Sequence, residues 1–129
     1  MKQVLISVFL IVLCSSLFSQ NSRKSIRNVV DSLNFEIQKS EDDSLKSEHL
    51  IVIADIFQNK NPDSTFYYAE KALILAEKFN NISIQVGALG FISGSLVKKG
   101  NLPKALEMAF RALHHLYPLR IDYKTRYHI

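Results

Sequence analysis

Residues 89–116 contain two apolar-periodic segments joined by a short polar turn. In both segments, apolar side chains recur every three or four positions, as they do along one face of a helix. On the second segment, the residues of this inner face are Ala105, Ala109, Ala112, Leu113 and Leu116. In the turn, Gly100 is the left-handed residue that commonly ends a helix, and Asn101 is a cap for the next one. Pro103 lies in a first helical turn, where its missing backbone donor is not needed. The pattern predicts a helical hairpin.

Residues 50–79 repeat this pattern closer to the N-terminus. Residues 61–64 read Asn-Pro-Asp-Ser, which is the chemistry of a turn followed by a helix cap. On either side of this turn, apolar and small side chains fall on one face of a helix. The residues on the two predicted faces are Leu50, Ile53, Ala54 and Phe57, and Thr65, Ala69, Ala72 and Ala76. The stretch predicts a second hairpin.

The spacing of the small residues resembles that of a tetratricopeptide repeat. That family has a Gly at the turn between its two helices, an Ala soon after it, a second Ala two helical turns later and then a Pro. Gly100, Ala105, Ala112 and Pro118 follow this series. The resemblance covers residues 44–118 and is to the exported bacterial type. It implies an all-α fold: a right-handed α-solenoid of antiparallel helical hairpins, with about five helices after an N-terminal signal peptide.

Two positions depart from the family pattern, and the period is longer. Ser93 stands where Gly or Ala is usual in the first helix, and Ala109 stands where an aromatic residue is usual in the second. Ala72 and Ala112 are forty residues apart, whereas the basic repeat has about 34 residues. The longer interval resembles the subclass with extended helices.

The first residues have the arrangement of a secretory signal: Lys2, then an uncharged apolar run, then small residues. We expect residues 1–19 to be this signal, cleaved after Ser16 or after Ser19, and the rest of the chain to be periplasmic or secreted. A permanent membrane anchor would need about 20 apolar residues, more than this run supplies. Cys14, the single cysteine, follows a leucine rather than the small residue that lipid attachment requires, so cleavage would leave no thiol.

The remaining chain divides into three predicted parts. Residues 20–43 are an N-terminal capping helix followed by an acidic linker, and residues 44–118 are the two hairpins. Residues 119–129 are either a basic tail or the start of an incomplete third repeat. The apolar stripe expected to pack the capping helix on the first repeat consists of Ile26, Val29, Val30, Leu33 and Ile37.

The distribution of charge limits the classes of partner. The net charge is +4, and residues 98–129 contain seven Lys or Arg residues but only two acidic residues, Glu107 and Asp122. Glu107 is expected to pair with Arg111, one helical turn further along. Because the chain carries an export signal and no recognisable nucleic-acid motif, we expect no nucleic-acid partner.

Reactive side chains are not grouped as catalysis would require. His114 and His115 are adjacent, and adjacent side chains on a helix point about 100° apart, so the two cannot share a metal ion in the usual one-turn arrangement. No motif places a nucleophile, a base and a cation together. We therefore expect no catalytic residues, no metal and no cofactor, and hence no enzyme.

The family resemblance also implies where a partner would bind, because one side of each repeat's first helix lines the concave surface. Carried over by position, these residues are Glu48, Ile51, Asp55, Gln58 and Asn59 in the first repeat, and Gly87, Gly90, Gly94, Val97 and Lys98 in the second. We hypothesise that the glycine-backed strip beside Ile51 and Asp55 receives a helix or an extended segment of a partner. The alternative is that the glycines permit tight packing against the preceding helix.

Two hypotheses of function follow. In the first, the chain is a non-catalytic exported module that binds a peptide or a partner protein. In the second, it is the sensory N-terminal part of a signalling protein, as in similar arrays that precede a histidine kinase or a helix-turn-helix regulator. A homo-oligomer through the open face of the last hairpin is a further expectation. Membrane association is expected only through an uncleaved signal or through sequence beyond residue 129.

Overall fold

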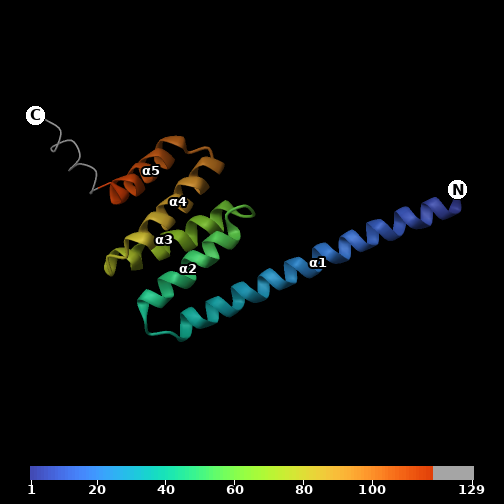
Figure 1. Ribbon diagram of the computed structural model, residues 1–129, viewed down its shortest axis with the longest axis horizontal. Coiled ribbons are helices and arrows are strands. Elements are labelled where there is room, and N and C mark those ends of the chain that lie inside the picture. Colours follow the sequence, from blue (N-terminus) through green and yellow to red (C-terminus); the bar gives the residue numbers. More distant parts are fainter. Residues whose placement is uncertain (118–129) are drawn as a thin grey trace, which may run out of the picture. The chain divides into compact units, whose positions relative to one another are not determined.

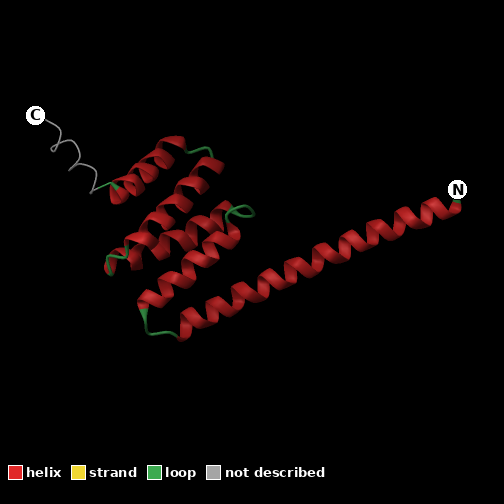
Figure 2. Cartoon of the chain, viewed as in Figure 1, coloured by secondary structure: helices red, strands yellow, loops and turns green. Residues whose placement is uncertain are grey.

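The computed structural model describes residues 1–117 and consists of helices joined by short turns (Figures 1 and 2). The helices are α1 (Lys2–Lys39), α2 (Asp43–Phe57), α3 (Pro62–Lys78), α4 (Ile82–Lys98) and α5 (Leu102–Leu116). Residues 1–117 contain no strand, so the predicted all-α class is confirmed. The five helices correspond to the capping helix and the two hairpins, except that α1 also continues back through the predicted signal.

The chain has two compact units, whose boundary lies within α1 between Ser32 and Leu33. The first unit, residues 1–32, is helical from Lys2 onward, and its N-terminal apolar side chains are exposed. By length and composition, α1 could cross a membrane, and a signal sequence near an N-terminus has the same properties. A long apolar N-terminal helix is therefore present, as a signal would require.

The second unit begins at Leu33 and includes the last turns of α1 together with α2 to α5. Each of these four later helices begins with a side chain that accepts hydrogen bonds from backbone N–H groups of the first turn. These capping residues are Asp42, Asn61, Asn81 and Asn101. Gly100 has a φ of 78°, and Asn80, in the preceding turn, has a φ of 54°. The cap predicted within residues 61–64 is Asn61, and the cap predicted at Asn101 and the left-handed Gly100 are confirmed.

The core of this unit is built around α3, which packs against α2 on one side and α4 on the other. Ala69, Ala72 and Ala76 of α3 have no exposed surface. Because a methyl group is the whole side chain, the neighbouring helices can approach α3 closely. Leu50 of α2 and Leu89 of α4 belong to the same buried cluster. The regularly spaced alanines that the sequence pattern identifies are thus the residues of α3 that are buried in the core.

Residues that are forty positions apart have equivalent roles in the two hairpins. Asn61 and Asn101 are both caps, and Thr65 and Ala105, four residues after them, are both buried. The first helices of the two hairpins, α2 and α4, also contact each other. These are features of a repeat, whereas the right-handed solenoid stays a prediction.

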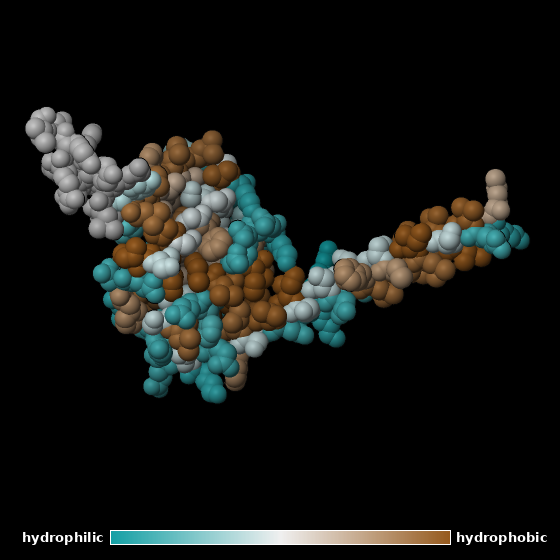
Figure 3. Space-filling model, in the orientation of Figure 1, coloured by the Kyte–Doolittle hydropathy of each residue, from teal (hydrophilic) through white to brown (hydrophobic). Residues whose placement is uncertain are grey.

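The outer side of α5 differs from the expected pattern. Leu113 and Leu116, which we expected on the inner face, are exposed, and the buried residues are Ala105 and Met108. No described helix packs on that outer side of α5. Figure 3 shows apolar surface, in brown, at the top of the helical unit that contains α5. The exposed apolar residues of this helix are Leu102, Leu106, Phe110, Leu113 and Leu116. Pro118 and residues 119–129 lie outside the described residues.

The predicted pair between Glu107 and Arg111 is wrong. Glu107 instead binds Lys104, with 2.8 Å between Oε2 and Nζ. Arg111 reaches across to α3, where its Nη2 lies 3.0 Å from Oε1 of Glu77. Helical spacing made Glu107 a reasonable partner, but a carboxylate on the neighbouring helix offers Arg111 another one.

Candidate partner-binding site

The ten residues proposed to contact a partner come from α2, from the turn after it and from α4. We call this set of residues the α2–α4 face. They are Glu48, Ile51, Asp55, Gln58, Asn59, Gly87, Gly90, Gly94, Val97 and Lys98. Direct contact between α2 and α4 brings the two sets together. A Cβ added to Gly87 would lie 3.9 Å from Cγ1 of Ile51, an ordinary van der Waals distance.

Polar contacts join the C-terminal ends of these two helices. The Lys98 ammonium donates to the backbone carbonyl of Gln58 and lies 3.4 Å from Oδ1 of Asn59. The amide of Gln58 in turn donates to Oδ1 of Asp55 at 2.6 Å. The network therefore holds four of the ten residues at one end of the face, with Asp55 and Lys98 bringing opposite charges to it.

The middle of the face is bare helix backbone. Gly90 and Gly94 are exposed, and a Cβ added at either position would have no atom of a neighbouring element within 4 Å. Tight packing therefore does not require glycine at these two positions, and that alternative is wrong for both. A glycine inside a helix costs about 1 kcal/mol relative to alanine. No packing contact with the described residues offsets this loss of stability at Gly90 or Gly94.

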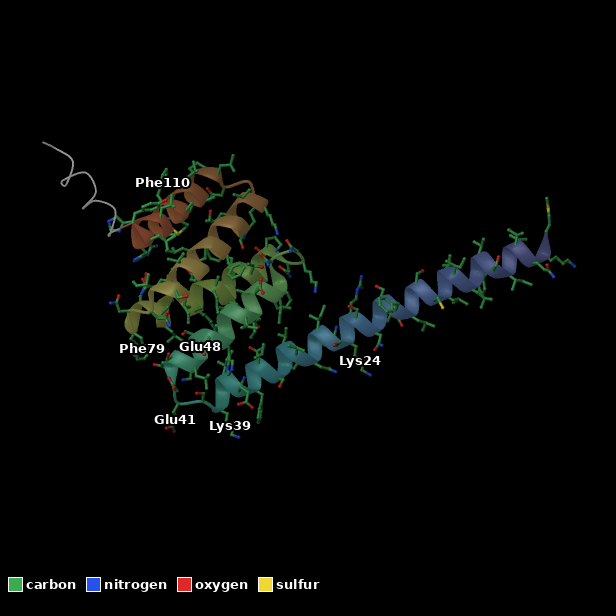
Figure 4. The ribbon with its side chains drawn as sticks, in the orientation of Figure 1. Lys24, Lys39, Glu41, Glu48, Phe79 and Phe110 are labelled. Carbon is green, nitrogen blue, oxygen red and sulfur yellow. The ribbon has the colours of Figure 1, made fainter. Side chains whose placement is uncertain are left out.

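The two ends of the face differ in character. Glu48, labelled in Figure 4, is exposed near the start of α2 and makes no ion pair with any described residue. Val97, near the end of α4, is 51% exposed. Glu48 and Asp55 are seven residues apart, which places them on the same side of α2. The face thus combines two carboxylates, one ammonium, two partly or fully exposed aliphatic side chains and bare backbone.

Within residues 1–117, no three His, Cys, Asp or Glu side chains lie close enough together to hold a metal ion. His114 and His115 are neighbours on α5, with ring centroids 6.4 Å apart and ring planes at 78°. The α2–α4 face contains no histidine and no cysteine. What the arrangement offers chemically is hydrogen bonding, charge and shape.

Sequence reasoning missed a pocket of about 440 Å³ on another side of the second unit. The last turns of α1, one side of α2 and one side of α3 line it, and Tyr67, Tyr68 and Lys71 are among its residues. The sequence does contain a signal for it, because Tyr67 and Lys71 are four residues apart and therefore adjacent on a helix. What no local pattern reveals is the α1 segment that forms the opposite wall.

Asp43, which the sequence places in the acidic linker, is the first residue of α2 and joins two helices. Its Oδ2 lies 2.8 Å from Nζ of Lys78 at the end of α3, and its Oδ1 lies 3.1 Å from Nζ of Lys46. The hydrogen bond from Lys78, followed by the one from Lys46, lowers the pKa of the Asp43 carboxyl below its ordinary value of 3.8.

Comparison of the chain with models of protein families, with curated proteins and with solved structures finds no match. The resemblance to tetratricopeptide repeats therefore rests on the residues named above and stays a prediction.

We expect the Asp43 contacts to stabilise the fold in a pH-dependent way. Because the folded-state pKa is lowered, their stabilisation is fully present above pH 3.8 and is lost as the pH falls through the lower folded-state value. Asp43→Asn should therefore reduce stability near neutral pH, and its difference from the wild type should shrink in acid. Urea unfolding of both chains across this range, followed by circular dichroism, measures the difference. A difference that stays constant with pH would contradict the assignment.

We also expect Gly90→Ala and Gly94→Ala each to raise the free energy of unfolding by about 0.5–1 kcal/mol, since alanine is the better helix former and its methyl group has room at both positions. Gly100→Ala is the matched control. It should lower stability, because the φ of 78° is strained for a residue with a Cβ. Urea unfolding of the three variants measures these changes. Destabilisation by Gly90→Ala or Gly94→Ala would mean that the glycine backbone packs on something.

Proposed function

We propose that this protein is a non-catalytic helical module that binds a peptide or a segment of a partner protein on its α2–α4 face. The observation that carries the proposal is the exposed pair Gly90 and Gly94, which the packing of α4 does not require. Helix-interior glycines without a packing role lower stability, so a functional reason for them is favoured. Bare backbone lets another chain approach the helix axis more closely than any side chain would.

The chemistry of the rest of the face favours a polypeptide segment as the partner. Ile51 of α2 and Val97 of α4 offer aliphatic contacts, while Glu48 and Asp55 offer carboxylates. Such a mixture of apolar and charged groups is typical of surfaces that bind an amphipathic helix or an extended strand. The resemblance to tetratricopeptide repeats, whose first helices line a binding surface, supports the same assignment.

The proposal includes export of the module. The apolar N-terminal part of α1 supports it, because a segment of this kind near an N-terminus directs secretion when it serves as a signal. The binding module would then act in the periplasm or outside the cell. The second hypothesis, a signalling protein with an effector beyond residue 129, concerns sequence outside the described residues and stays a prediction.

The test is site-specific crosslinking in the source cells. A photoreactive benzoylphenylalanine replaces Glu48 or Val97, both exposed on the α2–α4 face, or Glu70 of α3 as an exposed control. We expect a protein adduct from the two face positions and none from Glu70. Adding Gly90→Leu, which fills the bare strip, should reduce the adduct roughly tenfold or more, the size of a central interface contact.

Two controls separate binding from folding. Gly90→Ala adds only one methyl group and should reduce the adduct much less than Gly90→Leu, and circular dichroism should show that both variants are folded. The proposal is overturned if Glu70 gives the same adduct as the face positions, or if folded Gly90→Leu leaves the adduct unchanged.

A further inference from the structure

The pocket beside α3 has the size and lining of a small-molecule site. Its volume of about 440 Å³ lies within the range of about 300–1,000 Å³ typical of ligand pockets. Four aliphatic side chains line it: Ile37 from α1, Leu50 from α2, and Ile74 and Leu75 from α3. Ile74 is 61% exposed, so apolar surface of this lining residue is not covered by the protein. An apolar group of matching length would gain by burying it.

The charge in the pocket has one sign. Lys46 and Lys71 are its only ionisable residues of formal charge, and no carboxylate lines it. Lys46 is already paired with Asp43. Lys71 makes no ion pair with a described residue, and its Nζ lies 4.4 Å from the centroid of the Tyr67 ring. The cation–π contact holds the ammonium without neutralising it, so an anionic head group would complement it.

A hydroxyl donor accompanies this ammonium. The Tyr68 oxygen accepts a hydrogen bond from Nδ2 of Asn34 at 3.4 Å, which leaves the phenolic hydrogen to donate. The Tyr68 ring is held from two sides, stacked 6.0 Å from Phe57 and edge-on 5.1 Å from Tyr67. Besides the paired Lys46, the pocket thus contains one ammonium without a carboxylate partner, that of Lys71, and one positioned O–H donor, a combination suited to a carboxylate.

We propose that this pocket binds a medium-chain alkyl carboxylate, such as a free fatty acid. The carboxylate is held by Lys71 and the Tyr68 hydroxyl, and the alkyl chain lies against Ile37, Leu50 and Ile74. An alkyl chain fits better than an aromatic one, because Lys71 already occupies a face of the Tyr67 ring. This site is separate from the proposed α2–α4 face, since its α2 residues, Lys46 and Leu50, are not among the ten of that face.

The test uses decanoic acid that carries a photoreactive diazirine at its terminal carbon, with the equivalent decanol and decylamine as matched probes. The full chain is held in lipid nanodiscs and labelled sites are mapped by mass spectrometry. We expect the decanoate probe to label the peptide that contains Ile74 several-fold more than the other two probes do. The exposed apolar residues 4–13 should label similarly with all three probes and serve as the internal reference.

Variants identify the head-group contact. Lys71→Gln should lower decanoate labelling of the Ile74 peptide roughly tenfold, because a hydrogen bond between charged partners is lost. Lys60→Gln makes the same charge change in the turn after α2 and should leave the labelling unchanged. Lys71 is exposed, so the fold should persist, and circular dichroism checks this. Equal labelling by decanol, or unchanged labelling in Lys71→Gln, overturns the proposal, and neither result bears on the α2–α4 face.

Discussion

The close packing of α3 through its alanines is the contact on which the rest of the helical unit depends. Ala69, Ala72 and Ala76 are fully buried, and α2 and α4 pack on either side of the helix that carries them. α2 and α4 also contact each other. That second contact creates the α2–α4 face.

The local features of the fold could be predicted from the sequence. Asn61 and Asn101 cap their helices through hydrogen bonds that span only a few residues, and Gly100 meets a local backbone requirement. The features that were mispredicted depend on what lies across from a residue. Arg111 pairs with Glu77 of another helix, and Leu113 is exposed because no described helix covers it. Helical periodicity identifies a face but not the element that packs on it.

The candidate sites likewise have some features that could be predicted from the sequence and others that could not. The residues of the α2–α4 face could be named from repeat positions, and the structure brings α2 and α4 together as those positions require. Whether Gly90 and Gly94 face a neighbour or open space depends on distances that no pattern contains, and the structure leaves both open. The pocket beside α3 was missed because its walls come from three helices, although the Tyr67 and Lys71 pair was visible in the sequence.

The most direct test of this account compares leucine at two equivalent alanines, Ala72 and Ala112, which are forty residues apart. Ala72 is fully buried on the central helix, whereas Ala112 is only half-buried on the last described one. Urea unfolding should show that Ala72→Leu lowers the free energy of unfolding by about 1–3 kcal/mol, the cost of overpacking, and that Ala112→Leu costs less than about 1 kcal/mol. Equal effects at the two positions would contradict the central role of α3.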